Sequence, residues 1–105
     1  MKHASARALQ QLAPLIEQLR TLPSLVERTP GSFYYRSSAF LHFHEDPAGL
    51  FADAKLDFKL FERYRVSTRA EQSALFKAVA AALARSQSGA GSGAPRARGN
   101  SRSVS

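Results

Sequence analysis

The chain has 105 residues, 44% hydrophobic and 22% charged, a composition that predicts one soluble globular domain. The absence of cysteine excludes disulfides, zinc–thiolate sites and thiol nucleophiles. The net charge of +7 is uneven, because residues 1–85 carry 12 basic and 8 acidic side chains while residues 86–105 carry three arginines and no acid. No apolar run approaches the roughly 18 residues of a membrane span. The N-terminus lacks the apolar core of a secretory signal, so we expect a cytoplasmic protein.

The first part of the chain is predicted to be helical. Over residues 5–22, apolar side chains recur at the spacing of an amphipathic helix: Leu9, Leu12, Leu15, Ile16 and Leu19. Pro14 predicts either a kink or a helix that opens at this residue after a looser lead-in. Pro23 ends the helix or opens a short second turn over residues 24–28, and Thr29-Pro30-Gly31 is a loop.

The stretch from Ala39 to Leu56 is predicted to be a β-hairpin around which the rest of the chain packs. Its turn, Asp46-Pro47-Ala48-Gly49, has the Asp, Pro and Gly that a type I turn favours. A four-residue loop makes Glu45 the partner of Leu50. One face then pairs only apolar residues: Phe43 with Ala52, Leu41 with Ala54, and Ala39 with Leu56. The opposite face pairs His44 with Phe51, His42 with Asp53, and Phe40 with Lys55. We expect the apolar face to lie on the core, because a one-residue slip would mix polar with apolar side chains there.

Further strands and a second helix are expected around this hairpin. Aromatic enrichment predicts a strand over residues 32–36, and alternation predicts another over residues 60–66. The latter points Leu60, Tyr64 and Val66 one way and Phe61, Arg63 and Arg65 the other. Thr68 and Glu71 fit a capping box, which opens a helix that should end near Arg85.

These elements predict the α+β fold class in a single domain over residues 1–85. It consists of an N-terminal helix, an antiparallel meander of three to four strands and a C-terminal helix, with both helices on one face of the sheet. Residues 86–105 are rich in Gly, Ser and Arg and cannot bury enough apolar surface to fold, so we expect a disordered tail there.

The side chains of His42, His44 and Asp53 form the candidate metal site. Two histidines at i and i+2 on a strand share a face, and a carboxylate on the next strand completes a three-ligand set that suits Zn²⁺, Fe²⁺ or Ni²⁺. Glu45 and Asp46 at the rim could add a ligand or orient a ring. The alternative is a solvated His–Asp pair that contributes only about 0.2–1 kcal/mol to the sheet.

The same face is also a candidate binding surface. It would combine aromatic and cationic side chains: Phe40, His42, His44, Phe51, Asp53, Arg63 and Arg65, with Phe33, Tyr35 and Phe61 as further aromatic candidates. Such a face favours a protein partner or a homodimer. Stacking of single-stranded nucleic acid is the weaker alternative, because the folded part is only mildly basic.

The run from Ala39 to Gly49, followed by a second strand and a capped helix, resembles small bacterial luciferase-like domains, which carry a hairpin with two histidines separated by one residue. The later His-rich and Trp-containing segment of those domains is absent, and residues 61–66 (Phe-Glu-Arg-Tyr-Arg-Val) stand in its place. The layout is also similar to the MmcQ/YjbR type of uncharacterised bacterial proteins, for which DNA binding has been proposed on fold grounds. Neither resemblance implies an active site at particular positions here.

From the sequence we therefore expect a non-enzymatic module that binds a partner, or itself, through the open sheet face. The first alternative is a metal- or small-ligand-binding domain centred on His42, His44 and Asp53, with or without catalytic activity. The second alternative is a weak nucleic-acid binder.

Overall fold

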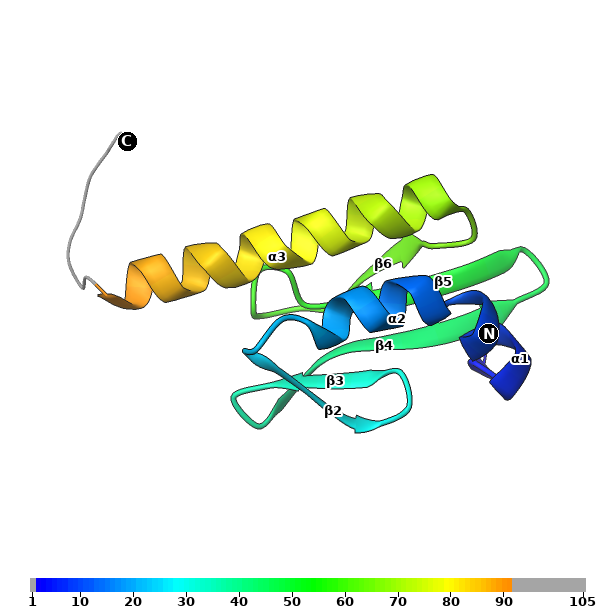
Figure 1. Ribbon diagram of the computed structural model, residues 1–105, viewed down its shortest axis with the longest axis horizontal. Helices are drawn as coiled ribbons and strands as arrows, with labels where there is room; N and C mark the ends of the chain where they lie inside the picture. Colours follow the sequence, from blue (N-terminus) through cyan, green and yellow to red (C-terminus); the bar gives the residue numbers. More distant parts are fainter. Residues whose placement is uncertain (1, 92–105) are drawn as a thin grey trace.

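The computed structural model describes residues 2–91, and these residues form one antiparallel sheet with helices against one of its faces (Figure 1). The elements follow one another as β1 (Lys2–His3), α1 (Ala6–Gln11), α2 (Ala13–Arg20), β2 (Leu25–Thr29), β3 (Ser32–Tyr35), β4 (Ser38–Asp46), β5 (Gly49–Ala54), β6 (Glu62–Arg65) and α3 (Arg69–Gly91). The predicted α+β class is confirmed. Within residues 2–91, no helix has both the length and the hydrophobicity that a membrane crossing requires.

The sheet is a meander with one additional strand. Its order is β2-β3-β4-β5-β6, so each of these strands pairs with its neighbour in sequence. The short strand β1 pairs with the far end of β4, where Lys2 lies opposite Glu45 and His3 opposite His44. Strands β1 and β3 therefore share the same edge of β4. The sequence had predicted three or four strands, and both β1 and β2 were missed.

The predicted hairpin register is confirmed over most of its length. Five pairs stand as expected: Leu41 with Ala54, His42 with Asp53, Phe43 with Ala52, His44 with Phe51, and Glu45 with Leu50. The loop is tighter than predicted, because Asp46 also pairs with Gly49 and leaves only residues 47–48 between the strands. Strand β5 ends at Ala54, although the Lys55 amide still donates to the Phe40 carbonyl at 2.9 Å.

The core lies between the apolar face of the hairpin and the two longer helices. Strands β4 and β5 contribute Leu41, Phe43, Ala52 and Ala54, helix α2 contributes Leu15, Ile16 and Leu19, and helix α3 contributes Leu75, Val79 and Leu83, all buried in one cluster. Both helices therefore cover the same face, as the sequence predicted. The other face of β4 and β5, which carries the histidines, has neither helix over it.

Phe40 and Phe33 were predicted on the open face, and both predictions are wrong. Each is only 1% exposed and belongs to the core cluster. Tyr35, a further aromatic candidate for that face, also lies on the helix side, because its ring packs against Phe40 and its hydroxyl hydrogen-bonds to Ser86 of α3. The cause for Phe40 is a β-bulge: the pairing of β3 with β4 steps from Phe33–Leu41 to Tyr34–Ala39, so Phe40 is an extra residue on β4. Such an insertion re-aims a side chain, and here it turns Phe40 to the same side as Leu41.

The N-terminal helical region divides at Leu12. Helix α1 ends at Gln11, Leu12 is the N-cap residue of α2, and Pro14 stands in the first turn of α2. The prediction that Pro14 opens an ordered helix is thus correct, because its missing N–H has no partner to lose in a first turn. Residues 25–29, expected as part of a short turn, instead form β2. Glu27 fixes this strand by accepting hydrogen bonds from Arg20 and from the Gly31 amide.

The C-terminal helix begins as predicted and ends later. The Thr68 hydroxyl accepts from the Glu71 amide and the Glu71 carboxylate accepts from the Thr68 amide, both at 3.1 Å, which is a capping box. The helix continues to Gly91 rather than ending near Arg85. Ser86, expected in the disordered tail, hydrogen-bonds through its Oγ to the Tyr35 hydroxyl at 2.9 Å. The remainder of the predicted tail, residues 92–105, lies outside the described residues.

Candidate metal centre

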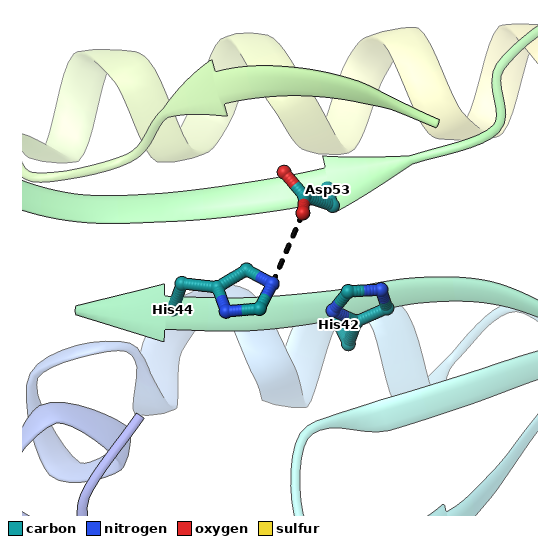
Figure 2. A group of neighbouring side chains, drawn as sticks. All are labelled: His42, His44 and Asp53. Atoms are coloured by element: carbon teal, nitrogen blue, oxygen red, sulfur yellow. Dashed lines mark ion pairs between the residues drawn. The ribbon is translucent and has the colours of Figure 1, made fainter. Parts of the chain in front are cut away.

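The centre of the open sheet face carries the three side chains that the sequence grouped together. His42 and His44 lie two residues apart on β4 and so point to the same face, and Asp53 lies on β5 directly opposite His42 (Figure 2). One nitrogen or oxygen donor from each side chain lies within 4.8 Å of the other two. The register of the hairpin therefore brings together the predicted candidate ligands.

Asp53 is held in place from the neighbouring strand. Arg63 on β6 lies opposite Asp53 and donates from Nε to Oδ1 at 2.9 Å and from Nη2 to Oδ2 at 3.0 Å. These two parallel hydrogen bonds fix the plane of the carboxylate. They also hold the pKa of Asp53 below its usual value, although burial opposes this shift. The carboxylate is consequently ionised at neutral pH, with only 12% of the side chain exposed.

His44 approaches the same carboxylate without forming a hydrogen bond to it. Its Nε2 lies 3.0 Å from Asp53 Oδ2, drawn as a dashed line in Figure 2. This nitrogen is buried and has no hydrogen-bond partner among the described residues, which means that the contact is close but not aligned for an N–H donor.

His42 also carries a buried ring nitrogen without a partner. Its Nδ1 has no hydrogen bond in the part of the chain that the structure describes. Burial lowers the pKa of His42 below its ordinary value, and the nearby His44 lowers it further. The imidazole is therefore neutral at physiological pH, the form in which a ring nitrogen can bind a metal ion. Unpaired polar atoms in a buried setting are uncommon, so two in one cluster require an explanation.

The surroundings of the cluster add a third imidazole and an aromatic side chain. His3 on β1 stacks on His44, with 5.4 Å between ring centroids, and lies 6.3 Å from the ring of His42. Phe61 meets the ring of His42 edge-on at 4.9 Å. Sequence reasoning did not place His3 here, because a two-residue strand gives no periodic signal. The presence of a third histidine in the chain was the only available indication.

The remaining residues predicted for this face are distributed around the cluster rather than in it. Phe51 lies opposite Arg65 and is half-buried, but the guanidinium of Arg65 is directed to Glu71 at 3.2 Å. The carboxylate of Glu45 accepts from the Ser5 amide. Asp46 accepts from the Ala48 amide in the turn at 3.0 Å. The hairpin thus leaves a compact group of three candidate ligands, supported by Arg63.

The donor set suits a first-row divalent ion. Two imidazole nitrogens and one carboxylate oxygen match the ligands of zinc sites with an open position and of non-haem iron sites. In a tetrahedral site with bonds of about 2.1 Å, donors stand about 3.4 Å apart. The donors here reach 4.8 Å, so ring and carboxylate rotations would have to draw them together.

Comparisons with protein families, with curated proteins and with solved structures found no match to this chain. The two resemblances noted in the sequence therefore stay predictions, and the function has to be argued from the geometry of the site.

Proposed function

We propose that this domain binds a divalent metal ion, Zn²⁺ above all, through His42, His44 and Asp53. The observation that carries the proposal is the cluster of three donors within 4.8 Å of one another, in which Nδ1 of His42 has no hydrogen-bond partner in the described part of the chain and Nε2 of His44 meets Asp53 Oδ2. An ion between the two ring nitrogens and Asp53 would satisfy both nitrogens. It would also separate His44 from the carboxylate that it now meets at 3.0 Å.

Arg63 supports the proposal as a positioning residue rather than as a ligand. Asp53 Oδ1 accepts only from Arg63 Nε, whereas Oδ2 accepts from Nη2 and faces His44. A metal ion at Oδ2 leaves the Nε–Oδ1 hydrogen bond intact, so the carboxylate keeps its orientation. Outer hydrogen bonds of this kind are typical of metal sites, and their loss weakens metal binding by about 10–100-fold.

Calorimetric titration with Zn²⁺ tests the proposal, with Co²⁺ absorption spectra reporting the coordination geometry. We expect one saturable site in the full chain, and we expect His42→Ala, His44→Ala and Asp53→Asn each to abolish it. Arg63→Met should weaken binding by about 10–100-fold without removing it. Glu17→Gln, which changes an exposed carboxylate on α2, is the matched control and should leave binding unchanged. Failure to bind Zn²⁺, or equal losses in the Glu17 variant, would contradict the proposal.

A second candidate function places a protein partner or a second copy of the chain on the same face. It is favoured by two adjacent apolar side chains just before β6, Leu60 and Phe61, which are 71% and 42% exposed. Exposed aromatic side chains of this kind dominate interface energetics. Sedimentation over a range of protein concentrations, with Phe51→Ala and Phe61→Ser as variants, tests this candidate. Dimerisation that Phe61→Ser abolishes while His42→Ala does not would favour it over the metal site.

The nucleic-acid alternative has its own signature. Binding to single-stranded DNA or RNA would weaken steeply with salt, because each phosphate contact releases a counterion. A flat salt dependence would exclude it.

A further inference from the structure

A cavity of about 320 Å³ lies at one end of the sheet, outside the histidine cluster. Three segments contribute its lining: the end of β3 and the start of β4 with the turn between them, the connection between β5 and β6, and α3 at Ser86. The residues that matter for its chemistry are Tyr35, Arg36, Ser38, Lys55, Phe58 and Ser86. Its volume is at the small end of the range of about 300–1,000 Å³ typical of ligand pockets.

The lining carries two positive charges and no acidic group. The Arg36 guanidinium lies 5.1 Å from the centre of the Tyr35 ring, and Lys55 Nζ donates to Ser38 Oγ at 3.2 Å. Within residues 2–91, neither cation forms an ion pair. A concave site lined by charge of one sign focuses its field on a ligand of the opposite sign.

The wall behind these cations is aromatic and fixed. The Tyr35 and Phe58 rings lie 5.2 Å apart, and each also contacts Phe40, at 6.1 and 5.7 Å. The hydrogen bond of 2.9 Å between the Tyr35 hydroxyl and Ser86 Oγ joins this wall to α3. The cavity therefore offers an apolar surface to one end of a ligand and two cations to the other.

The backbone around the cavity has a positive φ at three positions. Arg36, Ser37 and Phe58 have φ angles of 51°, 68° and 64°, and they are the only non-glycine residues with positive φ in the described chain. Arg36 and Ser37 form the two-residue loop between the paired residues Tyr35 and Ser38, where positive φ at both positions is ordinary hairpin geometry. Phe58 is the outlier, because a bulky residue rarely adopts this conformation, and such outliers concentrate at ligand sites. Arg36 and Phe58 line the cavity, and Ser37 connects two residues that line it.

An adjoining hollow of about 490 Å³ shares Phe58 and Ser86, and its charged lining residues are Asp57, Glu62 and Arg85, so acidic side chains outnumber the basic one. These carboxylates disfavour an anion in that hollow. The anionic group of a ligand is therefore expected in the cavity beside Arg36 and Lys55 rather than in the adjoining hollow.

We propose that this cavity binds a small carboxylate with an apolar ring or branched chain. The carboxylate would lie between Arg36 and Lys55, with Ser38 Oγ as an additional donor, and the apolar part would lie against Tyr35, Phe40 and Phe58. Charge-assisted hydrogen bonds of this kind are roughly twice as strong as neutral ones. Lys55 Nζ also lies 5.0 Å from the centre of the Phe61 ring, which meets the ring of His42, so the two sites are neighbours. None of the three candidate metal ligands lines the cavity, so the two proposals are tested by different variants.

The test is a titration of the ¹⁵N-labelled full chain with sodium phenylacetate at constant ionic strength, followed by NMR. We expect saturable shifts of the amide signals of residues 35–39, 55–58 and 86. Shifts limited to the signals of His42 and His44 are not expected. The uncharged analogue 2-phenylethanol should bind at least about tenfold more weakly, since it cannot use the charge-assisted contacts.

Substitution of the two cations distinguishes binding in this cavity from nonspecific attraction of an anion to a basic protein. Arg36→Gln and Lys55→Met should each weaken phenylacetate binding about tenfold. Arg28→Gln is the matched control, because Arg28 lies over the neighbouring Tyr34 ring at 4.5 Å but does not line the cavity. It should leave the affinity unchanged. Absence of saturable shifts up to about 10 mM, which would fill a site of millimolar affinity, would overturn the proposal. Equal binding of the alcohol, or equal losses in the Arg28 variant, would overturn it too.

Discussion

The burial of Phe40 by the β-bulge makes a quantitative prediction about stability. Phe40 is 1% exposed and packs against the rings of Tyr35 and Phe58. A buried phenyl ring removes about 150 Å² from water, which at about 25 cal/mol per Å² corresponds to about 4 kcal/mol. This agrees with the loss of about 3–5 kcal/mol that Phe→Ala causes in protein cores. A Phe on the open face would cost less than about 0.5 kcal/mol when truncated.

Urea unfolding of Phe40→Ala, followed by far-ultraviolet circular dichroism, measures this loss. A domain of this size has a free energy of unfolding of about 5–13 kcal/mol, so the substitution removes a large part of it. Phe40→Leu retains part of the burial and gives a measurable transition if the alanine variant does not fold. Phe51→Ala, a half-buried phenylalanine on the paired strand, is the control and should lose less. A loss below about 1 kcal/mol for Phe40→Ala, or one no larger than that of Phe51→Ala, would refute the assignment of Phe40 to the core.

Three further substitutions test other parts of the fold. Gly31→Ala should lower the free energy of unfolding by at least about 1–2 kcal/mol, because Gly31 has a φ of 80° and an added Cβ would lie 2.9 Å from a leucine methyl carbon; thermal unfolding measures it. Glu71→Gln should make the free energy of unfolding depend less on pH at acidic pH. The hydrogen bond from the Thr68 amide lowers the pKa of Glu71, so its stabilising contribution is present above the unfolded pKa of about 4.3 and lost as pH falls through the lower folded value. Urea unfolding midpoints of the variant and the parent protein, measured between acidic and neutral pH, test this prediction. Equal losses of stability in the two proteins would disprove it. Ser67→Ala should cost about 1 kcal/mol in urea unfolding, since Ser67 Oγ accepts from the Leu50 amide at 2.8 Å; an unchanged midpoint would contradict it.

The hairpin and its two faces could be predicted because local chemistry determines them. The turn at Asp46 and Gly49 sets the register, and the register sorts Leu41 and Phe43 from His42. The loop proved two residues tighter than expected, but the pairing did not change, because both loop lengths keep Glu45 opposite Leu50. The candidate metal site follows directly from this register.

The features that sequence could not predict depend on contacts between distant segments. Strand β2 follows Pro23 without clear alternation, and it is held by pairing with β3 and by the Arg20–Glu27 ion pair. The bulge that turns Phe40 inward interrupts a segment whose alternation was otherwise regular. The part of α3 beyond Arg85 contacts distant segments, with Ser86 hydrogen-bonded to Tyr35 and Gln87 donating to Ser24. None of these contacts is visible in a local window of residues.

The position of β1 has a consequence for the order of folding. The pairings among strands β2 to β6 all join sequence neighbours, so each of these pairings closes a short loop and can form early. Strand β1 instead joins residues 2–3 to residues 44–45, it is only two residues long, and both are exposed. Such an element has little to hold it, so it docks after the hairpin has formed and is among the first to open in the native state. We therefore expect the imidazole of His3 to reach His44 only after the hairpin has formed, and the cluster to lose this third ring whenever the N-terminal strand detaches.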